Sequence, residues 1–224
     1  MNENQNFNIH PDNLIKLMSN EKYDKSIHEN FTLKYNGGAV ESHEMNANDL
    51  AKSLMALSNV LERVTYITNG SNSNIFVKVK GSFKPGSFDV DLVTLLTCAG
   101  VQTVVNSVAI IGFIKDNFKS LIWFFKKTKG EKIESINHLD SNNIELILNN
   151  CEKITVNNYV LAAYQDKVVR KEIENFVSPL EDMDMSDITL LHNGIEQTKI
   201  TRDERKYFYA PGEDVIVNKS TDYL

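Results

Sequence analysis

The feature that most limits the folds open to this chain is a stretch of 23 residues, Leu92–Ile114, without a charged side chain. The stretch is long enough to cross a bilayer, because a transmembrane helix needs about 20 apolar residues. Six polar residues interrupt it, however, and the Val and Leu residues at its start, interrupted by Thr94 and Thr97, are typical of a strand. We therefore expect a strand that ends near Thr97, followed by one long hydrophobic helix over about 101–127 that protein atoms bury.

The predicted helix over 101–127 is apolar on most of its sides. A helix of this kind must be surrounded, and a chain of 224 residues has few elements with which to surround it. We therefore expect another subunit to supply part of the cover. The expected interface residues lie along this helix: Val104, Val108, Ile110, Ile111, Phe113, Ile114, Trp123 and Phe124.

A basic run begins where the uncharged stretch ends. Six lysines stand against Asp116 and Glu131, a local charge of +4 in a chain of net charge −6. The run is either a patch for an anionic lipid or nucleic acid, with Trp123 and Phe124 as aromatic neighbours, or a helix end whose lysines complement the helix dipole. The acidic pI, near 5.4, disfavours nucleic acid, which requires basic surface. The candidate patch is Lys115, Lys119, Lys126, Lys127 and Lys129.

The segment before the uncharged stretch predicts a helix and a hairpin. Apolar residues at helical spacing from Leu50 to Val64 predict an amphipathic helix over about 46–68, with Asn46 as its N-cap. Two alternating segments around a turn at 83–86 then predict antiparallel strands with opposite charges on their wet face. In one register Lys80 faces Asp89 and Lys78 faces Asp91, and in a register slipped by two residues Lys80 faces Asp91.

The C-terminal part of the chain alternates strands and helices. Strands are predicted over 144–148 and 153–156, a helix from Asn157 or Asn158 to Ser178, and a hairpin around Asn193-Gly194. A capping box, Thr201 to Glu204, opens a short final helix. A strand over 215–217 has no partner left, so it returns to pair upstream or the natural chain continues beyond Leu224. The predicted fold is α+β, with a polar N-terminal arm (1–30), a core domain (31–135) and a smaller α+β region (139–224).

Three short motifs resemble ligand-binding or catalytic sites, but a structural role explains each of them better. The glycines of 81–87 lack the spacing and following helix of a phosphate-binding loop, so we interpret them as a hairpin turn. Asp182-x-Asp184-x-Ser186 lacks the glycine of a calcium loop and is interpreted as an acidic linker. His43, with Glu41 and Glu44, is interpreted as a polar turn. No catalytic, cofactor or metal residue is predicted, and two scattered cysteines without a signal peptide indicate the cytoplasm.

The order of these elements resembles an uncharacterised family of bacterial and prophage proteins. The resemblance covers about residues 31–209, and it rests on a strand with a Gly-Gly turn, the amphipathic helix, the hairpin over 81–92, the aromatic end of the hydrophobic helix at 123–127, and the segment 201–205. It implies a mobile-element setting, such as phage–host conflict, and it implies no activity or site residue.

These observations favour a non-enzymatic interaction protein that associates with itself or with another protein. The alternative from a second class is a protein that acts at or in a membrane through residues 92–127. A third class, an enzyme whose site is assembled from scattered residues, stays open because such sites leave no motif in the sequence.

Overall fold

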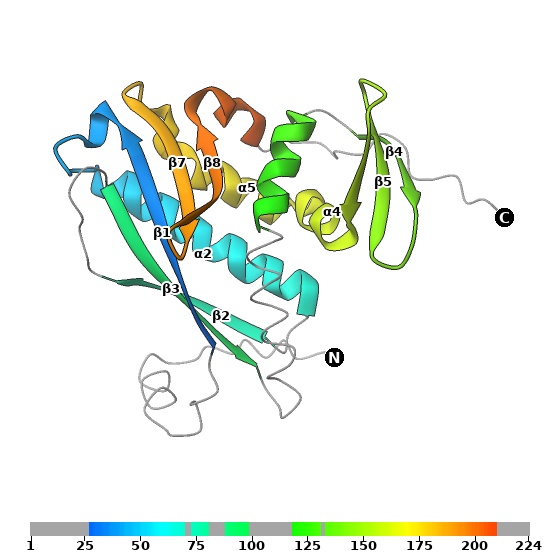
Figure 1. The fold of residues 1–224 in the computed structure, drawn as a ribbon, viewed down its shortest axis with the longest axis horizontal. Coiled ribbons are helices and arrows are strands. Elements are labelled where there is room, and N and C mark those ends of the chain that lie inside the picture. The colour runs from blue at the N-terminus through cyan, green and yellow to red at the C-terminus, as the bar shows by residue number, and fades with distance from the viewer. Residues whose placement is uncertain (1–26, 70–72, 81–87, 99–117, 131–132, 210–224) are drawn as a thin grey trace, which may run out of the picture.

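The structure is a computed structural model that describes residues 27–69, 73–80, 88–98, 118–130 and 133–209. Within these residues the chain forms two antiparallel sheets packed with helices, so the predicted α+β class is confirmed (Figure 1). The strands are β1 (Ile27–Gly37), β2 (Ser73–Lys80), β3 (Phe88–Cys98), β4 (Ile133–His138), β5 (Asn143–Leu148), β6 (Lys153–Asn157), β7 (Met185–His192) and β8 (Ile195–Thr201). The helices are α2 (Ala47–Asn69), α4 (Asn158–Gln165), α5 (Lys167–Phe176), an unlabelled helix over 118–128, and the 3-10 helices η2 (Gly38–Val40), η4 (Ser178–Glu181) and η5 (Arg202–Phe208).

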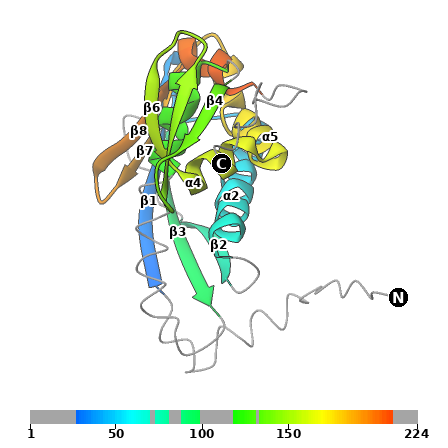
Figure 2. The same ribbon diagram turned by 90° about the vertical axis from the view of Figure 1, so that its right-hand side faces the viewer.

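The larger sheet has the order β2-β3-β1-β7-β8 and is built around β1. Side chains of β1 alternate: Phe31, Leu33 and Tyr35 are buried, whereas Thr32 and Lys34 lie on the opposite, polar face. Helices α2 and α5 cover the apolar face (Figure 2). The sheet therefore has one face in the core and one polar face, as is usual for antiparallel sheets.

The sheet crosses the expected domain boundary. β1 pairs with β3 on one side and with β7 on the other, so strands from 31–135 and from 139–224 share one sheet. The larger sheet therefore takes strands from both sides of the boundary expected at 135–139. The expected arm over 1–30 also needs correction at its end, because β1 begins at Ile27. Residues 1–26 lie outside the described residues.

The predicted hairpin forms, in the second of its two registers. β2 and β3 pair antiparallel with Lys80 opposite Asp91. Lys78 lies opposite Val93, and Asp89 lies opposite Lys34 of β1, a partner that the hairpin alone did not indicate. The lysines and aspartates nevertheless share the polar face, because a shift by two residues keeps every side chain on the same side of the sheet.

Helix α2 forms as its sequence predicts. The side chain of Asn46 accepts hydrogen bonds from the backbone N–H groups of Asn48 and Asp49, at 2.9 and 3.4 Å. This is the capping interaction expected of asparagine at a helix start. The helix ends at Asn69, and its buried face, centred on Val60 and Val64, packs on the apolar face of the sheet.

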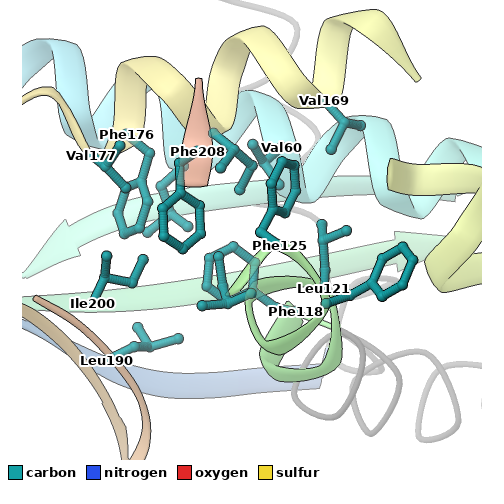
Figure 3. Packing of buried hydrophobic residues seen from close by; sticks show 14 of the residues in the cluster. Val60, Phe118, Leu121, Phe125, Val169, Phe176, Val177, Leu190, Ile200 and Phe208 are labelled. Carbon is teal, nitrogen blue, oxygen red and sulfur yellow. The ribbon is translucent and has the colours of Figure 1, made fainter. Parts of the chain in front are cut away.

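The hydrophobic helix is described only over 118–128, and the first part of the expected span, residues 101–117, lies outside the described residues. Its inward side chains join an aromatic cluster with α4, α5 and η5 (Figure 3). Phe125 stacks on Phe208 with ring centroids 5.5 Å apart, and Phe118 meets Phe176 edge to face at 6.1 Å. Aromatic pairs at these separations add stability beyond the area that they bury.

The smaller sheet, β4-β5-β6, includes one strand that the sequence did not predict. β4 has a single fully buried side chain, Ile133, and its weak alternation explains why the pattern missed it. The helix expected from Asn157 to Ser178 is two helices, because Asp166 ends α4 and caps α5. Asn157 is the N-cap of α4, where it accepts from the N–H of Tyr159.

The hairpin of β7 and β8 turns at Asn193-Gly194, as predicted, and both residues have positive φ angles, 51° and 78°. The capping box at Thr201 is also present, although the helix that it opens, η5, is a 3-10 helix. The expected strand over 215–217 lies outside the described residues.

Candidate functional site

The two edges of the larger sheet, β8 and β2, differ in what lies beside them. Helix 118–128 lies beside β8 in Figure 1. The ammonium group of Lys126 donates to the backbone carbonyl of Lys199 on β8, and its Nζ lies 2.7 Å from Oε2 of Glu204. A lysine that occupies an edge carbonyl prevents another strand from using it. This edge is therefore partly closed.

Glu204 is held firmly in this arrangement. Its carboxylate also accepts from the backbone N–H and the hydroxyl of Thr201, at 2.9 and 3.1 Å. Burial by itself would raise the pKa of Glu204, but the hydrogen bonds from Lys126 and Thr201 outweigh it, and the pKa lies below its usual range. Glu204 is therefore ionised at neutral pH and completes both the capping box and the ion pair.

The outward face of helix 118–128 is bracketed by a second ion pair. Lys127 Nζ lies 2.6 Å from Oε1 of Glu152, in the turn between β5 and β6, and this contact lowers the pKa of Glu152. Trp123 lies one helical turn before Lys127, with 44% of its surface exposed, and Lys119 is exposed one turn earlier. An indole between lysines is thus the main exposed feature of this helix.

The opposite edge, β2, is different. Among the described strands only β3 pairs with β2, so the backbone groups on the other side of β2 face no described strand. On the face that packs toward α2, exposure rises along the strand: Ile75 is buried, Val77 is half-buried and Val79 is 58% exposed. A long edge with an exposed β-branched residue is a template for pairing with another chain.

A hollow of about 430 Å³ lies between η4 and η5. In this hollow Arg205 donates to the hydroxyl of Tyr209 at 2.6 Å, forms an ion pair with Glu181, and lies over the Tyr209 ring with its guanidinium carbon 5.0 Å from the ring centroid. The residues that line the hollow are Leu180, Glu181, Arg202, Asp203, Arg205, Lys206 and Tyr209.

Two buried polar clusters have structural roles. Asp187, on the polar face of the sheet, accepts from Asn36, Thr189 and Ser186 at 2.7, 2.9 and 3.1 Å, and lies 3.2 Å from Lys199 Nζ. In the core, Tyr35 donates to Ser53 at 3.0 Å, and Ser53 donates to the carbonyl of Phe176 at 2.7 Å. Burial raises the pKa of Tyr35 far above its usual range, which keeps the phenol neutral. Such fully bonded groups hold elements together, as buried polar groups generally do.

The structure places the predicted interface residues unevenly. Phe124 is fully buried inside the chain, where its ring meets Tyr164 at 4.6 Å, so the expectation that it lies at a subunit surface is corrected. Its neighbour Trp123 is exposed. The other expected interface residues lie outside the described residues: Val104, Val108, Ile110, Ile111, Phe113 and Ile114.

The predicted lysine patch is likewise divided. Lys126 and Lys127 form ion pairs within the chain, whereas Lys119 and Lys129 are exposed. Lys115 lies outside the described residues. The sequence interpretation missed the cations of η5, although their signal was present: Arg202, Arg205 and Lys206 recur beside Tyr207 and Tyr209 within one short segment.

Comparison of the chain with protein-family models, with curated proteins and with solved structures finds no match. In the part of the chain that the structure describes, no helix has the length and apolar character that crossing a membrane requires. The same residues contain no group of three or more His, Cys, Asp or Glu side chains placed to hold a metal ion.

Proposed function

We propose that the chain is a non-enzymatic, self-associating interaction protein that acts in the cytoplasm, in the mobile-element setting that its sequence resemblance implies. The observation that carries the proposal is the contrast between the two sheet edges. Lys126 occupies a carbonyl on β8, whereas β3 is the only described strand paired with β2. Pairing of two β2 strands across a two-fold axis would extend the sheet from five strands to ten and satisfy backbone groups of both copies.

The sequence of β2 is self-complementary in one antiparallel register. If the axis passes through Val77, this residue lies opposite Val77 of the second copy, and the exposed Val79 lies opposite Ile75. Odd-numbered residues then face odd-numbered residues, so the apolar faces of the two sheets are continuous and α2 of each copy lies on the same side. Lys78 and Lys80 lie opposite the positions of Phe76 and Asn74, which carry no charge.

The two lysines also disfavour registers that are displaced toward the C-terminal end of β2. An axis through Lys78 places this residue opposite its own copy, and an axis through Val79 places Lys78 opposite Lys80. Like charges directly opposite one another destabilise a strand pair. The lysines that protect an edge against indiscriminate pairing therefore leave the Val77-centred register available.

The test measures the mass of the protein in solution at tens of micromolar by light scattering, with sedimentation as a second method. The wild type is expected to be a dimer. Val79→Lys should shift it to monomer, because a third lysine on β2 would lie on the apolar face of the joint. The matched control is Ile195→Lys, which alters an apolar residue of similar exposure, 68%, on the opposite edge strand and should leave the dimer intact. A wild type that stays monomeric would overturn the proposal.

A second candidate function has its own observation, the exposed Trp123 with Lys119 and Lys127 one turn away on either side. Tryptophan and lysine together are typical of segments that bind anionic membrane surfaces. Flotation with vesicles that contain phosphatidylserine tests this alternative. Binding that Trp123→Ala and Lys119→Glu both weaken would support it, and absence of binding at low salt would exclude it.

A further inference from the structure

We infer that the hollow between η4 and η5 is a binding site for a small phosphorylated ligand. This inference is independent of self-association. It begins from helix geometry, because side chains three residues apart are aligned in a 3-10 helix. Arg202 and Arg205 therefore form one row on η5, and Asp203 and Lys206 form the adjacent row, while Tyr209 follows the helix as its C-cap. All five residues line the hollow.

The charges in the hollow favour an anion. Three cations face two carboxylates, in a chain whose net charge is −6. One carboxylate, Glu181, already pairs with Arg205, so Asp203 alone stands beside Arg202 and Lys206. Arg202 uses one of its N–H groups on the carbonyl of Met183, at 3.0 Å. Its other N–H groups, and the ammonium of Lys206, which lies 5.4 Å from the centroid of the Tyr207 ring, are the chemistry that recognises phosphate.

Arg205 provides a preorganised floor for this site. Its side chain is 18% exposed and is fixed by Glu181, by the Tyr209 hydroxyl and by the Tyr209 ring. Its Nε is buried and has no hydrogen-bond partner among the described residues. A cation whose position is set before binding loses little entropy when a ligand arrives. Arg205 therefore contributes field and shape, whereas Arg202 and Lys206 make the direct contacts.

The size of the hollow sets the class of ligand. Sites for small molecules span about 300–1,000 Å³, and a hollow of about 430 Å³ lies near the lower end. It accommodates a mononucleotide or a sugar phosphate more readily than a polymer. Tyr209, with 46% of its surface exposed, offers an aromatic surface beside the cations.

Calorimetric titration at low ionic strength tests the inference with four probes: inorganic phosphate, pyrophosphate, AMP and adenosine. Saturable binding is expected for the probes that carry phosphate, and none for adenosine. Arg202→Gln and Lys206→Gln should each weaken binding about tenfold, the effect of removing one charge-assisted hydrogen bond, and the double variant should abolish it. Lys171→Gln, which removes an exposed lysine on α5, is the matched control and should bind like the wild type.

Because Arg202 and Lys206 are exposed, the variants should keep the wild-type thermal midpoint, which separates loss of binding from loss of fold. If AMP binds and inorganic phosphate does not, the site recognises the nucleoside as well as the phosphate. If both bind with equal affinity, the site recognises the phosphate group alone. Either result supports the inference. It is overturned if no phosphorylated probe binds the folded wild type, if adenosine binds as tightly as AMP, or if the double variant binds like the wild type.

Discussion

Asp166 and Arg63 are joined by two hydrogen bonds that end on a single carboxylate oxygen: Arg63 Nε and Nη2 lie 2.9 and 2.7 Å from Oδ2 of Asp166. The other oxygen, Oδ1, accepts from the backbone N–H groups of Val168 and Val169 at 2.9 and 3.0 Å. One carboxylate thus caps α5 and ties the junction of α4 and α5 to α2. Burial alone would raise the pKa of Asp166, but these donors outweigh it and lower the pKa.

Removal of the Asp166 carboxylate should therefore destabilise the fold more than removal of its partner. Asp166→Ala loses a helix cap, about 1 kcal/mol, and a partly exposed ion pair, at most about 1 kcal/mol. Arg63→Gln should lose only the second contribution, and so should Asp166→Asn, because asparagine can still cap α5. Urea unfolding of these three variants, and of the double variant that combines Asp166→Ala with Arg63→Gln, checks this order. Equal losses for Asp166→Ala and Arg63→Gln would contradict a role in capping.

Asp187 predicts a dependence of stability on pH. Burial favours its neutral form, but hydrogen bonds from Asn36, Thr189, Lys199 and Ser186 together lower its pKa in the folded protein. A group with a lowered folded pKa contributes stability above its unfolded pKa, about 3.9 for Asp, and loses it as pH falls through the folded value. The free energy of unfolding should therefore fall steadily below about pH 5.

The matched comparison is Asp187→Asn, which keeps the shape of the side chain and removes its titration. This variant should be less stable than the wild type at pH 7 and should show a shallower decline on acidification. Urea midpoints measured from pH 7 down to about pH 3 provide the test. Parallel curves for the two proteins would show that Asp187 is not part of the acid response, and would leave the other carboxylates with lowered pKa values, Asp166 and Glu204 among them, as its sources.

Charge reversal at two lysines of helix 118–128 should have unequal effects. In the structure Lys126 contacts Glu204 and the carbonyl of Lys199, so a glutamate there would place two carboxylates beside each other and an acceptor beside a carbonyl. We expect Lys126→Glu to lower the thermal midpoint by several degrees, as about 1 kcal/mol does. Lys119→Glu, on the exposed side of the same helix, should stay within about 0.5 kcal/mol of the wild type.

Two glycines with positive φ angles should respond differently to alanine. At Gly37 (φ 135°) a Cβ atom would lie 2.2 Å from the carbonyl oxygen of Asp184, which is a backbone atom and not the end of a flexible side chain. At Gly194 (φ 78°) a Cβ atom would meet nothing within 4 Å, so only the conformational penalty of about 1 kcal/mol applies. Gly37→Ala should therefore lower the free energy of unfolding much more than Gly194→Ala does, and urea unfolding of the two variants measures this difference. Similar losses at the two positions would argue against steric conflict at Gly37.

The proposed β2 joint also makes a geometric prediction. Residues directly opposite in an antiparallel pair have Cβ atoms about 4.5–5.5 Å apart, close to what a disulfide requires. In a background that carries both Cys98→Ser and Cys151→Ser, Val77→Cys should therefore form a covalent dimer under mild oxidation. Val79→Cys should not, because in the Val77-centred register the two copies of residue 79 lie four residues apart along the strands. If the wild type has the mass of a dimer but only Val79→Cys cross-links, the two strands pair about a different axis, and self-association itself still holds.

Local sequence signals identified the elements that depend on a few neighbouring residues. Asn46, Asn193-Gly194 and the capping box at Thr201 each act over two to four residues, and each forms as predicted. The prediction of one long helix between residues 157 and 178 was wrong, and the cause is again a local interaction. A single side chain, Asp166, satisfies the end of one helix and the start of the next, and apolar periodicity does not register that interruption.

Long-range arrangement was beyond the sequence pattern. Nothing in the alternation of β1 indicates that it pairs with β7, to which Asn36 is linked through Asp187, 151 residues away. The proposed sites could not be predicted from the sequence for a related reason. The β2 edge, which faces no second described strand, depends on which strand lies at the end of the sheet order. The hollow depends on contact between Glu181 and Arg205, which requires η4 and η5 to be neighbours.

The central position of β1 sets the order in which the protein can fold as it is synthesised. β1, β2 and β3 are complete once Cys98 has been made, but the second partner of β1 ends only at His192. At about 5–20 residues per second, the roughly 90 residues between these points take roughly 5–20 seconds to translate. During that interval β1 is itself a sheet edge, flanked by unburied apolar side chains. A transcript truncated before β7 would make this interval permanent, and its product should engage chaperones or aggregate.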